Sequence, residues 1–397
     1  MADERTCNPI STTELQRRWV AVRAAMPEQK LDALIVQGAS NLAGTGGYFR
    51  WFTGVSMGTS YPATIVFPKD DLMTLVSHGP IGGERNLGGN DPHWRGVGKH
   101  LTTASFPAID YCVPYDPDLV AREIKKAGYQ RVGIVGWNNM LFGFGDRLRS
   151  QLSGVEILDA TRLVDPIKAK KSAEEIELIR MAAEMQDQIL LKVKDAIAAG
   201  KKDFEMFAYG HYIGNLLGSE TGYMLGSSAP PGQATQIRGR REQGREMRDG
   251  DVIYYQCENT GPGGMMTHVG RYYVLGKAPQ ELVDAFGTIV EAQDNTIRML
   301  EPGANCAEIF AEHNAFMRAR GMHDEPRLHC HGQGYDVVER PLIRNDEDML
   351  LGTSMNIGLH PTFGNARLFV TVCDNVLIDP NGEIEYLHKT PRTIFEL

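Results

Sequence analysis

The chain has 397 residues, of which 42% are hydrophobic and 23% are charged, a composition typical of a folded globular protein rather than a disordered or fibrous one. Its formal net charge of −9 comes without runs of like charge, which argues against a nucleic-acid-binding surface and favours a small polar substrate. No run of 18 apolar residues occurs, the N-terminus lacks the apolar core of a signal peptide and the six cysteines form no CxxC pair, so we expect a cytoplasmic protein with reduced thiols and no membrane partner.

The first part of the chain alternates helical and strand-like segments, as an α/β domain does. Ser11 lies three residues before Glu14, which is a capping-box signature, and apolar residues then recur at helical spacing as far as Pro27. The Gly-rich stretch from His78 to Phe106 predicts a loop, and residues 48–52 predict a strand with one buried face. Four short apolar segments bounded by Gly, Pro or Asp predict further strands, namely LDALIVQG, YPATIVFP, DLMTLVSHG and RVGIVGW.

A domain boundary is predicted within the segment LVDPIKAKKSAEEIELIR. Pro166 lacks the backbone N–H that a helix needs, so we expect it to resist helix formation and to mark the junction. We therefore assign residues 1–165 to an N-terminal α/β domain and residues 166–397 to a C-terminal domain.

The second domain is predicted to open on a long helix. Ser172 and Glu175 form a second capping box, and helical periodicity continues until Gly200 ends it. A further helix is expected from about residue 203 to 217, followed by a polar segment and by the strands DVIYYQCE and VGRYYVLG, which a GPGG turn joins. Two helices follow, and from Arg327 onward short strands alternate with turns, so the domain is predicted to be of the α+β class.

Six phrases of the second domain occur in an order and spacing that resemble one enzyme family. They are the helix after the boundary, DGDVIYY, LEPGANCAEIF, HCHGQGYDVVERP, the turn before HPTFG, and CDNVLIDPNGEIE. The chain resembles the family of creatinase, aminopeptidase P, prolidase and methionine aminopeptidase along essentially its whole length. The resemblance implies a pita-bread C-terminal domain with the active site in its concave sheet, within a homodimer.

The resemblance also identifies the positions where the metal-dependent members hold two metal ions. Four of the five expected ligands, all of them carboxylates, are replaced here, by Gln256, His268, His360 and Cys373, and the family histidine is kept as His331. The second of these positions falls at residue 267 or 268, and we choose His268 because an arginine follows it at the family's spacing. Two divalent ions about 3.5 Å apart repel by roughly 20 kcal/mol even at an effective dielectric constant of about 20. A paired-metal centre without carboxylates is therefore excluded.

Two kinds of catalysis remain for this set of side chains. The first, which we prefer, needs no metal or other cofactor: creatinase works without metal, and ectoine hydrolase resembles it in lacking the metal ligands. His331 and His360 are then the acid–base candidates, with His268 as a third participant and Glu339 orienting them or exchanging a proton. The alternative is a single Zn²⁺, Fe²⁺ or Cu²⁺ ion held by the three histidines.

The substrate-binding candidates are more varied in position. The resemblance to creatinase would place a catalytic histidine before the Gly-Asp turn, but that segment contains none, and Arg238 lies there instead. We expect Arg238 or Arg340 to hold a substrate carboxylate and Gln256 to donate or accept a hydrogen bond. The other candidates, an aromatic pair from the first domain and two residues near the histidines, are Phe49, Trp51, Tyr335 and Cys373.

The sequence thus predicts a hydrolase that cleaves a carbon–nitrogen bond in a small nitrogenous, non-peptide compound by metal-independent histidine catalysis. A mononuclear metalloenzyme, whether hydrolase, lyase or oxygen-using enzyme, is the alternative. Peptidase action on Xaa-Pro bonds and an inactive binding scaffold are further alternatives, but three imidazoles at the altered positions argue against simple decay.

Overall fold

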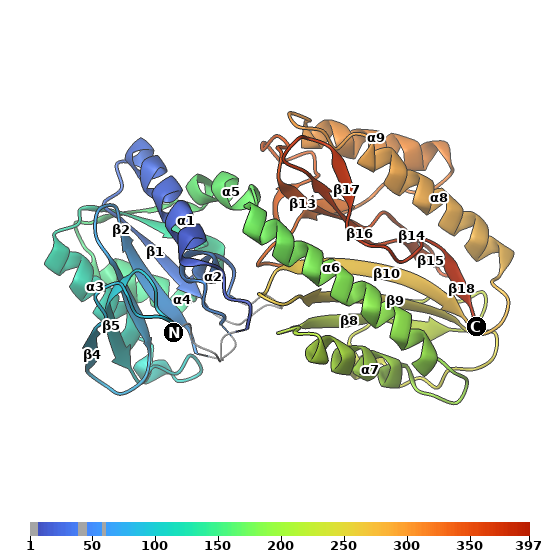
Figure 1. The fold of residues 1–397 in the computed structure, drawn as a ribbon, viewed down its shortest axis with the longest axis horizontal. Helices are drawn as coiled ribbons and strands as arrows, with labels where there is room; N and C mark the ends of the chain where they lie inside the picture. The colour runs from blue at the N-terminus through green and yellow to red at the C-terminus, as the bar shows by residue number, and fades with distance from the viewer. Residues whose placement is uncertain (1–6, 39–45, 58–60) are drawn as a thin grey trace. The chain divides into compact units, whose positions relative to one another are not determined.

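The structure is a computed structural model that describes residues 7–38, 46–57 and 61–397 (Figure 1). The chain divides into two compact units, Met1–Lys168 and Ala169–Leu397. This division lies three residues after the boundary that the sequence predicts. Each unit has buried apolar clusters of its own, so the two are described separately.

The first unit is built on a seven-stranded mixed sheet with the strand order β4-β5-β3-β2-β1-β6-β7. In its centre, β1 pairs antiparallel with β2 and parallel with β6. Helices pack on the sheet through apolar side chains such as Val120, Ile124 and Leu148. The strands are β1 (Ala33–Gly38), β2 (Ala63–Pro68), β3 (Met73–His78), β4 (Gly83–Asn86), β5 (Val97–Thr103), β6 (Arg131–Val135) and β7 (Glu156–Asp159), and the helices are α1 (Thr12–Ala25), α2 (Gly47–Thr53), α3 (Tyr115–Ala127), α4 (Phe142–Gln151) and α5 (Thr161–Ala169).

Three expectations for this unit are wrong. The stretch from His78 to Phe106 is not a loop, because β4 and β5 lie within it and β5 extends the sheet beside β3. Residues 48–52 form part of the helix α2 rather than a strand. Pro166 lies inside α5. A proline removes only one N–H from the helix, and the burial of Val164, two residues earlier, stabilises the helical conformation.

The second unit contains sheets of four, five and two strands (Figure 1). Their orders are β18-β10-β9-β8, β12-β11-β13-β16-β17 and β14-β15. A backbone bridge between Gly270 and Cys373 links β10 to the segment that precedes β16. The strands are β8 (Gly222–Ala229), β9 (Val252–Thr260), β10 (Met266–Val274), β11 (Cys330–Gly332), β12 (Glu339–Leu342), β13 (Met355–Leu359), β14 (Thr362–Gly364), β15 (Phe369–Thr371), β16 (Asp374–Ile378), β17 (Ile384–Tyr386) and β18 (Ile394–Glu396).

The helices of this unit follow the sequence closely. The capping box of Ser172 and Glu175 is present and opens the first of them, which ends at a 3₁₀ turn (Lys194–Ala196) shortly before Gly200. The predicted helix near residues 203–217 and the two that follow the strands are also confirmed. Their bounds are α6 (Ala173–Val193), α7 (Asp203–Leu216), α8 (Gln280–Ile297) and α9 (Cys306–Ala319).

The alternation of side chains along β9 places Gln256 and Glu258 on one face of this strand. Ile253, Tyr255 and Cys257 join the apolar cluster formed with α6 and α7. The intervening Val252 and Tyr254 join a second cluster, formed with α8 on the opposite face of the strand. Successive side chains of a strand point to opposite faces, so residues 256 and 258 continue the face of Tyr254.

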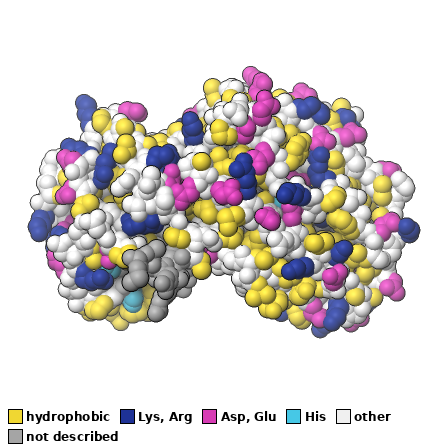
Figure 2. All heavy atoms as spheres, in the orientation of Figure 1, with side chains coloured by type: hydrophobic (Ala, Val, Ile, Leu, Met, Phe, Trp, Pro, Cys, Tyr) yellow, Lys and Arg dark blue, Asp and Glu magenta, His cyan; other side chains and the backbone are white. Residues whose placement is uncertain are grey.

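On the face drawn in Figure 2, charged side chains of both signs are scattered among apolar and polar ones. Figure 2 shows Lys and Arg interspersed with Asp and Glu on the face drawn. Among the residues that the structure describes, no helix is both long enough and apolar enough to span a bilayer.

Candidate active site

One cavity of the second unit, with a volume of about 560 Å³, brings the altered family positions together. Its polar walls come from the neighbouring strands β9 and β10, from β11 of the five-stranded sheet, and from the segments that follow β13 and β15. Positions far apart in the sequence thus meet in one place, as the resemblance implies. The five residues are Gln256, His268, His331, His360 and Cys373.

The register of the strands sets the order of these side chains. His268 on β10 lies opposite Glu258 on β9, and Gly270 lies opposite Gln256. The backbone N–H of His268 also donates to Oδ1 of Asn375 at 2.8 Å, which ties β10 to β16. The two strands therefore hold an imidazole and a carboxylate on the same face of the sheet.

Three imidazole rings form a compact cluster in the cavity. The ring centroid of His268 lies 5.6 Å from that of His331 and 5.6 Å from that of His360, and the last two are 5.2 Å apart. The ring of His268 meets His331 edge to face, with an interplanar angle of 88°. Each ring thus limits the orientation of the others.

His331 presents one nitrogen atom as a hydrogen-bond acceptor. Its Nδ1 lies 2.9 Å from the carbonyl oxygen of Gly332, which can only accept, so Nδ1 carries the proton and Nε2 keeps its lone pair. Burial and the neighbouring His268 lower the pKa of His331 to about 4. Burial likewise holds the pKa of His360 well below its usual range, with His331 adding to the effect. Both rings are therefore neutral near pH 7.

Glu258 is a site residue that the sequence prediction missed. Its Oε1 lies 3.6 Å from Nδ1 of His268, and its Oε2 accepts a hydrogen bond of 3.2 Å from Nε2 of Gln256. Burial alone would raise the pKa of Glu258, but the nearby ring of His268, with His331 and Arg327, lowers it overall. The carboxylate is therefore ionised beside the imidazoles. Its position two residues after Gln256 in a strand was the signal that could have found it.

Gln256 and Cys373 belong to a buried network rather than standing free in the cavity. The hydroxyl of Tyr254 donates to Oε1 of Gln256 at 2.9 Å and lies 3.1 Å from Sγ of Cys373. Burial raises the pKa of Cys373 to about 12, so the side chain stays a thiol near neutral pH. The hydrogen bond from Gln256 orients the carboxylate of Glu258, so Gln256 is a positioning residue in this geometry.

Gly358 provides the space that the ring of His268 occupies. A Cβ atom on Gly358 would lie 2.8 Å from both Cε1 and Nε2 of His268, closer than such atoms approach. We expect Gly358→Ala to displace this ring and to lower kcat about tenfold or more, because a shift of about 1 Å in an active site can cost 10²-fold. The matched control is Gly287→Ala in α8, where a Cβ meets nothing within 4 Å. Equal kcat values for the two variants would contradict this role of Gly358.

Three predicted site residues of the second unit lie outside the cavity walls. Glu339 forms a buried ion pair with Lys171, with Oε2 and Nζ 2.8 Å apart, so it holds the edge of the five-stranded sheet rather than the histidines. Tyr335 is buried, and Arg340 pairs with Glu347. None of the three is among the described residues that line the cavity.

The remaining candidates also lie elsewhere. Arg238 pairs with Glu242 at 2.7 Å and does not line the cavity in the described part of the chain. Phe49 and Trp51 belong to the first unit, where 0% and 1% of their surfaces are exposed. Within that unit their side chains pack in the core and have no surface left for a ligand.

The side chains do not fit the paired-metal centre that the family resemblance implies. Two carboxylates are among the described residues that line the cavity, and one of them, Glu325, accepts the backbone N–H groups of Arg327 and Leu328 at 2.8 Å each. Glu258 alone cannot offset the repulsion of two divalent ions. Three imidazoles are a ligand set that suits one zinc ion. However, no three His, Cys, Asp or Glu side chains in the described ranges are arranged to hold an ion. The positions of the donor atoms matter more than the spacing of the rings, because a metal ion binds the lone pairs of those atoms.

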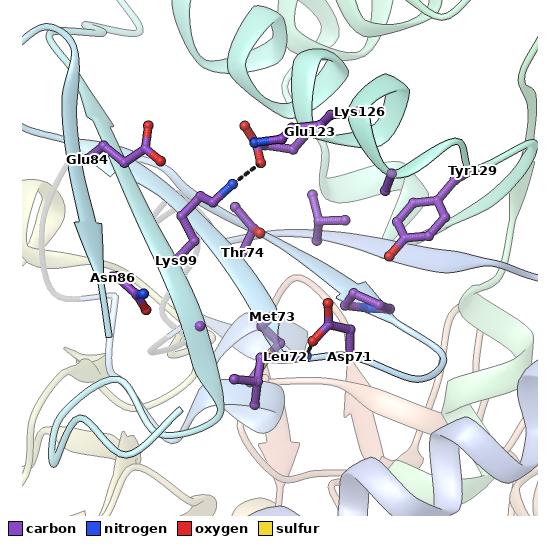
Figure 3. Close-up of a pocket in the computed structure, with 14 residues that line it drawn as sticks. Asp71, Leu72, Met73, Thr74, Glu84, Asn86, Lys99, Glu123, Lys126 and Tyr129 are labelled. Atoms are coloured by element: carbon purple, nitrogen blue, oxygen red, sulfur yellow. Dashed lines mark hydrogen bonds and ion pairs between the residues drawn. The ribbon is translucent and has the colours of Figure 1, made fainter. Parts of the chain in front are cut away.

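A second cavity, of about 450 Å³, lies in the first unit (Figure 3). Its lining comes from the strands β2 to β5, the turn before β3 and the helix α3, and an ion pair joins the lining residues Lys99 and Glu123 (Figure 3). No histidine or cysteine is among the described residues that line it. It therefore lacks a group that titrates near neutral pH, and we place the chemistry in the cavity of the second unit.

Comparisons with known proteins define the class of enzyme. Residues 177–380, just over half of the chain, match the model of metallopeptidase family M24, and the chain belongs to this family. The prolidase from Thermococcus sibiricus superimposes with a TM-score of 0.80 at 18% identity, covering 98% of this chain and 100% of that one. The expected fold, an α/β domain followed by a pita-bread domain, is confirmed.

The relatives with assigned functions are hydrolases of carbon–nitrogen bonds, and this chain is an enzyme of that class. Xaa-Pro dipeptidase from Pyrococcus horikoshii is 24% identical over 283 positions, which cover 67% of this chain and 75% of that protein. Ectoine hydrolase from Halomonas elongata is 22% identical over 414 positions, covering 98% of each. The two identities are too similar to choose between a peptide and a non-peptide substrate.

Proposed function

We propose that this enzyme hydrolyses a carbon–nitrogen bond in a small, non-peptide nitrogenous compound, without a metal ion, by acid–base catalysis in the histidine cavity. The observation that carries the proposal is His331, which is held in one tautomer with a free Nε2 and lies beside an ionised carboxylate. Supporting it, the donor set lacks the carboxylates that two metal ions need. We expect a homodimer, as the family resemblance implies, and we propose that it acts in the cytoplasm.

The roles of the side chains follow from their protonation states. Nε2 of His331 accepts a proton from water as the water oxygen attacks, and the same ring returns the proton to the leaving nitrogen. The charge of Glu258 raises the pKa of His331, so it favours the protonated ring that forms during the reaction. His360, neutral at the same pH, can donate an N–H to the oxygen on which negative charge develops. His268 fixes the orientation of both rings.

Removal of metal ions is expected to leave the rate unchanged. A screen of guanidino compounds, cyclic amidines, N-acyl amino acids and Xaa-Pro dipeptides first provides a substrate. We expect kcat after exhaustive dialysis against EDTA to equal that before it, because no step of the mechanism needs a Lewis acid. Dialysis against EDTA saturated with Ca²⁺ controls for effects of the chelator itself, and elemental analysis of the purified protein accompanies the assay.

The chelation experiment also decides between the two enzyme hypotheses. Loss of activity that one equivalent of Zn²⁺, Fe²⁺ or Cu²⁺ restores would replace the proposal by a mononuclear centre at His268, His331 and His360. The spacing of the three rings favours this alternative over any other metal site in the cavity. Turnover of Xaa-Pro dipeptides alone would contradict the non-peptide substrate class.

A further inference from the structure

Arg327 stands apart from the other charged residues of the cavity. Among the described residues that line it, Arg327 is the one Lys or Arg side chain. It lies on the exposed segment between α9 and β11, and its guanidinium forms no ion pair with a described residue. The two arginines that the sequence suggested for a substrate carboxylate, Arg238 and Arg340, are instead paired with Glu242 and Glu347.

Hydrogen bonds fix the backbone around Arg327, whereas its guanidinium forms no ion pair with a described residue. Oε1 of Glu325 accepts the backbone N–H groups of Arg327 and Leu328, both at 2.8 Å. The backbone N–H of Glu325 donates to Oδ1 of Asn314 on α9 at 2.7 Å. The nearest carboxylate in the sequence is thus occupied by the main chain, and the guanidinium keeps its donors for another partner.

The charge of Arg327 reaches the catalytic groups. The positive charge of Arg327 contributes to lowering the pKa of Glu258, His331 and His360. The electrostatic field of the guanidinium therefore acts on groups inside the cavity. His331 and His360 are neutral, and Oε2 of Glu258 and Oε1 of Glu325 accept hydrogen bonds from other groups of the protein. Because its guanidinium has no ion-pair partner among the described residues, Arg327 is the cationic lining group that an anionic substrate would meet.

Apolar side chains form much of the remaining wall. They offer a surface for a hydrocarbon group but no hydrogen bonds. Together with the volume of about 560 Å³, they suit a small substrate with an aliphatic part. The apolar residues are Leu225, Ile237, Leu328, Val337, Val338 and Phe369.

We propose that Arg327 binds a carboxylate of the substrate, and that the substrate is an N-acyl amino acid with a short aliphatic part. This inference rests on the proposed hydrolytic function and narrows its substrate class. The water oxygen bonds to the acyl carbon, the carbon–nitrogen bond breaks, and the nitrogen leaves with the proton that His331 returns. The products are a carboxylic acid and a free amino acid, whose carboxylate stays on Arg327 until release.

Two probes of nearly equal size test the proposal. N-acetyl-L-leucine carries the carboxylate, and N-acetyl-L-leucinamide replaces it with a neutral amide. We expect wild-type enzyme to release acetate from the acid with a kcat/KM about 30-fold or more above that for the amide, the range expected for hydrogen bonds to a charged group. Arg327→Gln should lose this advantage, with a change of less than about threefold for the amide. Arg318→Gln, which breaks an exposed ion pair with Asp324 outside the cavity, is the control.

Binding measurements separate the failure of this inference from that of the proposed function. Isothermal titration calorimetry of both probes is carried out with the wild type and both variants. If no acetate is released, the hydrolytic proposal fails for amides, yet tighter binding of the acid that disappears only in Arg327→Gln still supports the carboxylate site. Equal binding or turnover of the two probes by the wild type, or an unchanged preference in Arg327→Gln, overturns the inference.

Discussion

Replacing His331 with alanine is expected to lower kcat by about 10³-fold, in the middle of the range for removal of a general acid–base group. The variant loses the Nε2 atom that accepts the proton from water, and neither neighbouring ring can replace it. Burial holds the pKa of His360 far below its usual range, and both ring nitrogens of His268 are buried without a hydrogen-bond partner in the described structure. Steady-state kinetics on the substrate from the screen measure the effect.

The controls for this variant separate chemistry from folding. His211→Ala removes an exposed histidine of α7 and should leave kcat unchanged. Far-ultraviolet circular dichroism and the thermal midpoint should match those of the wild type. Glu258→Gln should lower kcat less, by about 10- to 100-fold, since the carboxylate acts on His331 through its charge. Normal turnover by His331→Ala would place the reaction elsewhere in the molecule.

The positions of the site were predictable from the sequence because the family phrases fix them in register, but their surroundings were not. The pairing of Glu339 with Lys171 joins residues 168 positions apart, and nothing local in the sequence indicates it. Arg327 was missed because a lone arginine in a turn resembles any exposed charge. Glu258, in contrast, lies one strand period after Gln256, so alternation alone could have revealed it.

The secondary structure was predictable where one periodic pattern determined it. The helix that begins after Ser172 and the strand that carries Gln256 have strong local signals, and both are present as expected. The strand β8 was missed because its glycines obscure the alternation of apolar residues. Gly226 in this strand has a φ of 133°, and a Cβ there would lie 1.9 Å from the carbonyl oxygen of Tyr254. Only glycine at position 226 permits this close pairing with β9, and the polar composition of β8 gave no indication of the pairing.

The helix α2 shows a different reason for an incorrect prediction. Its aromatic residues have a preference for strands, yet tertiary contacts hold them in a helix. Nε1 of Trp19 donates to the carbonyl oxygen of Phe52 at 2.7 Å, and the guanidinium of Arg18 lies 5.4 Å from the ring centroid of Trp51. Both partners belong to α1, more than thirty residues earlier, so a local pattern could not include them.

Replacing Arg271 with methionine is expected to destabilise the second unit by about 3–5 kcal/mol, the range for breaking a buried ion pair. Arg271 is fully buried, and its Nη2 lies 2.7 Å from Oδ1 of Asp374. Its other N–H groups donate to carbonyl oxygens, including that of Cys373 at 2.9 Å. Methionine keeps much of the volume but leaves a carboxylate and several carbonyl groups without their donor. Urea denaturation followed by circular dichroism measures the loss.

The source of this destabilisation can be isolated with a double variant. If the unpaired charge of Asp374 causes most of the loss, adding Asp374→Asn to Arg271→Met should recover at least about 1 kcal/mol, because the two changes are coupled. Arg344→Met, which breaks the exposed pair with Asp346, should shift the denaturation midpoint little, since water replaces the lost partner. Additive effects of the two buried substitutions would mean that packing, rather than the ion pair, joins β10 to β16. The position of Cys373 would then depend on the backbone bridge with Gly270 and on the contact with Tyr254 rather than on the ion pair.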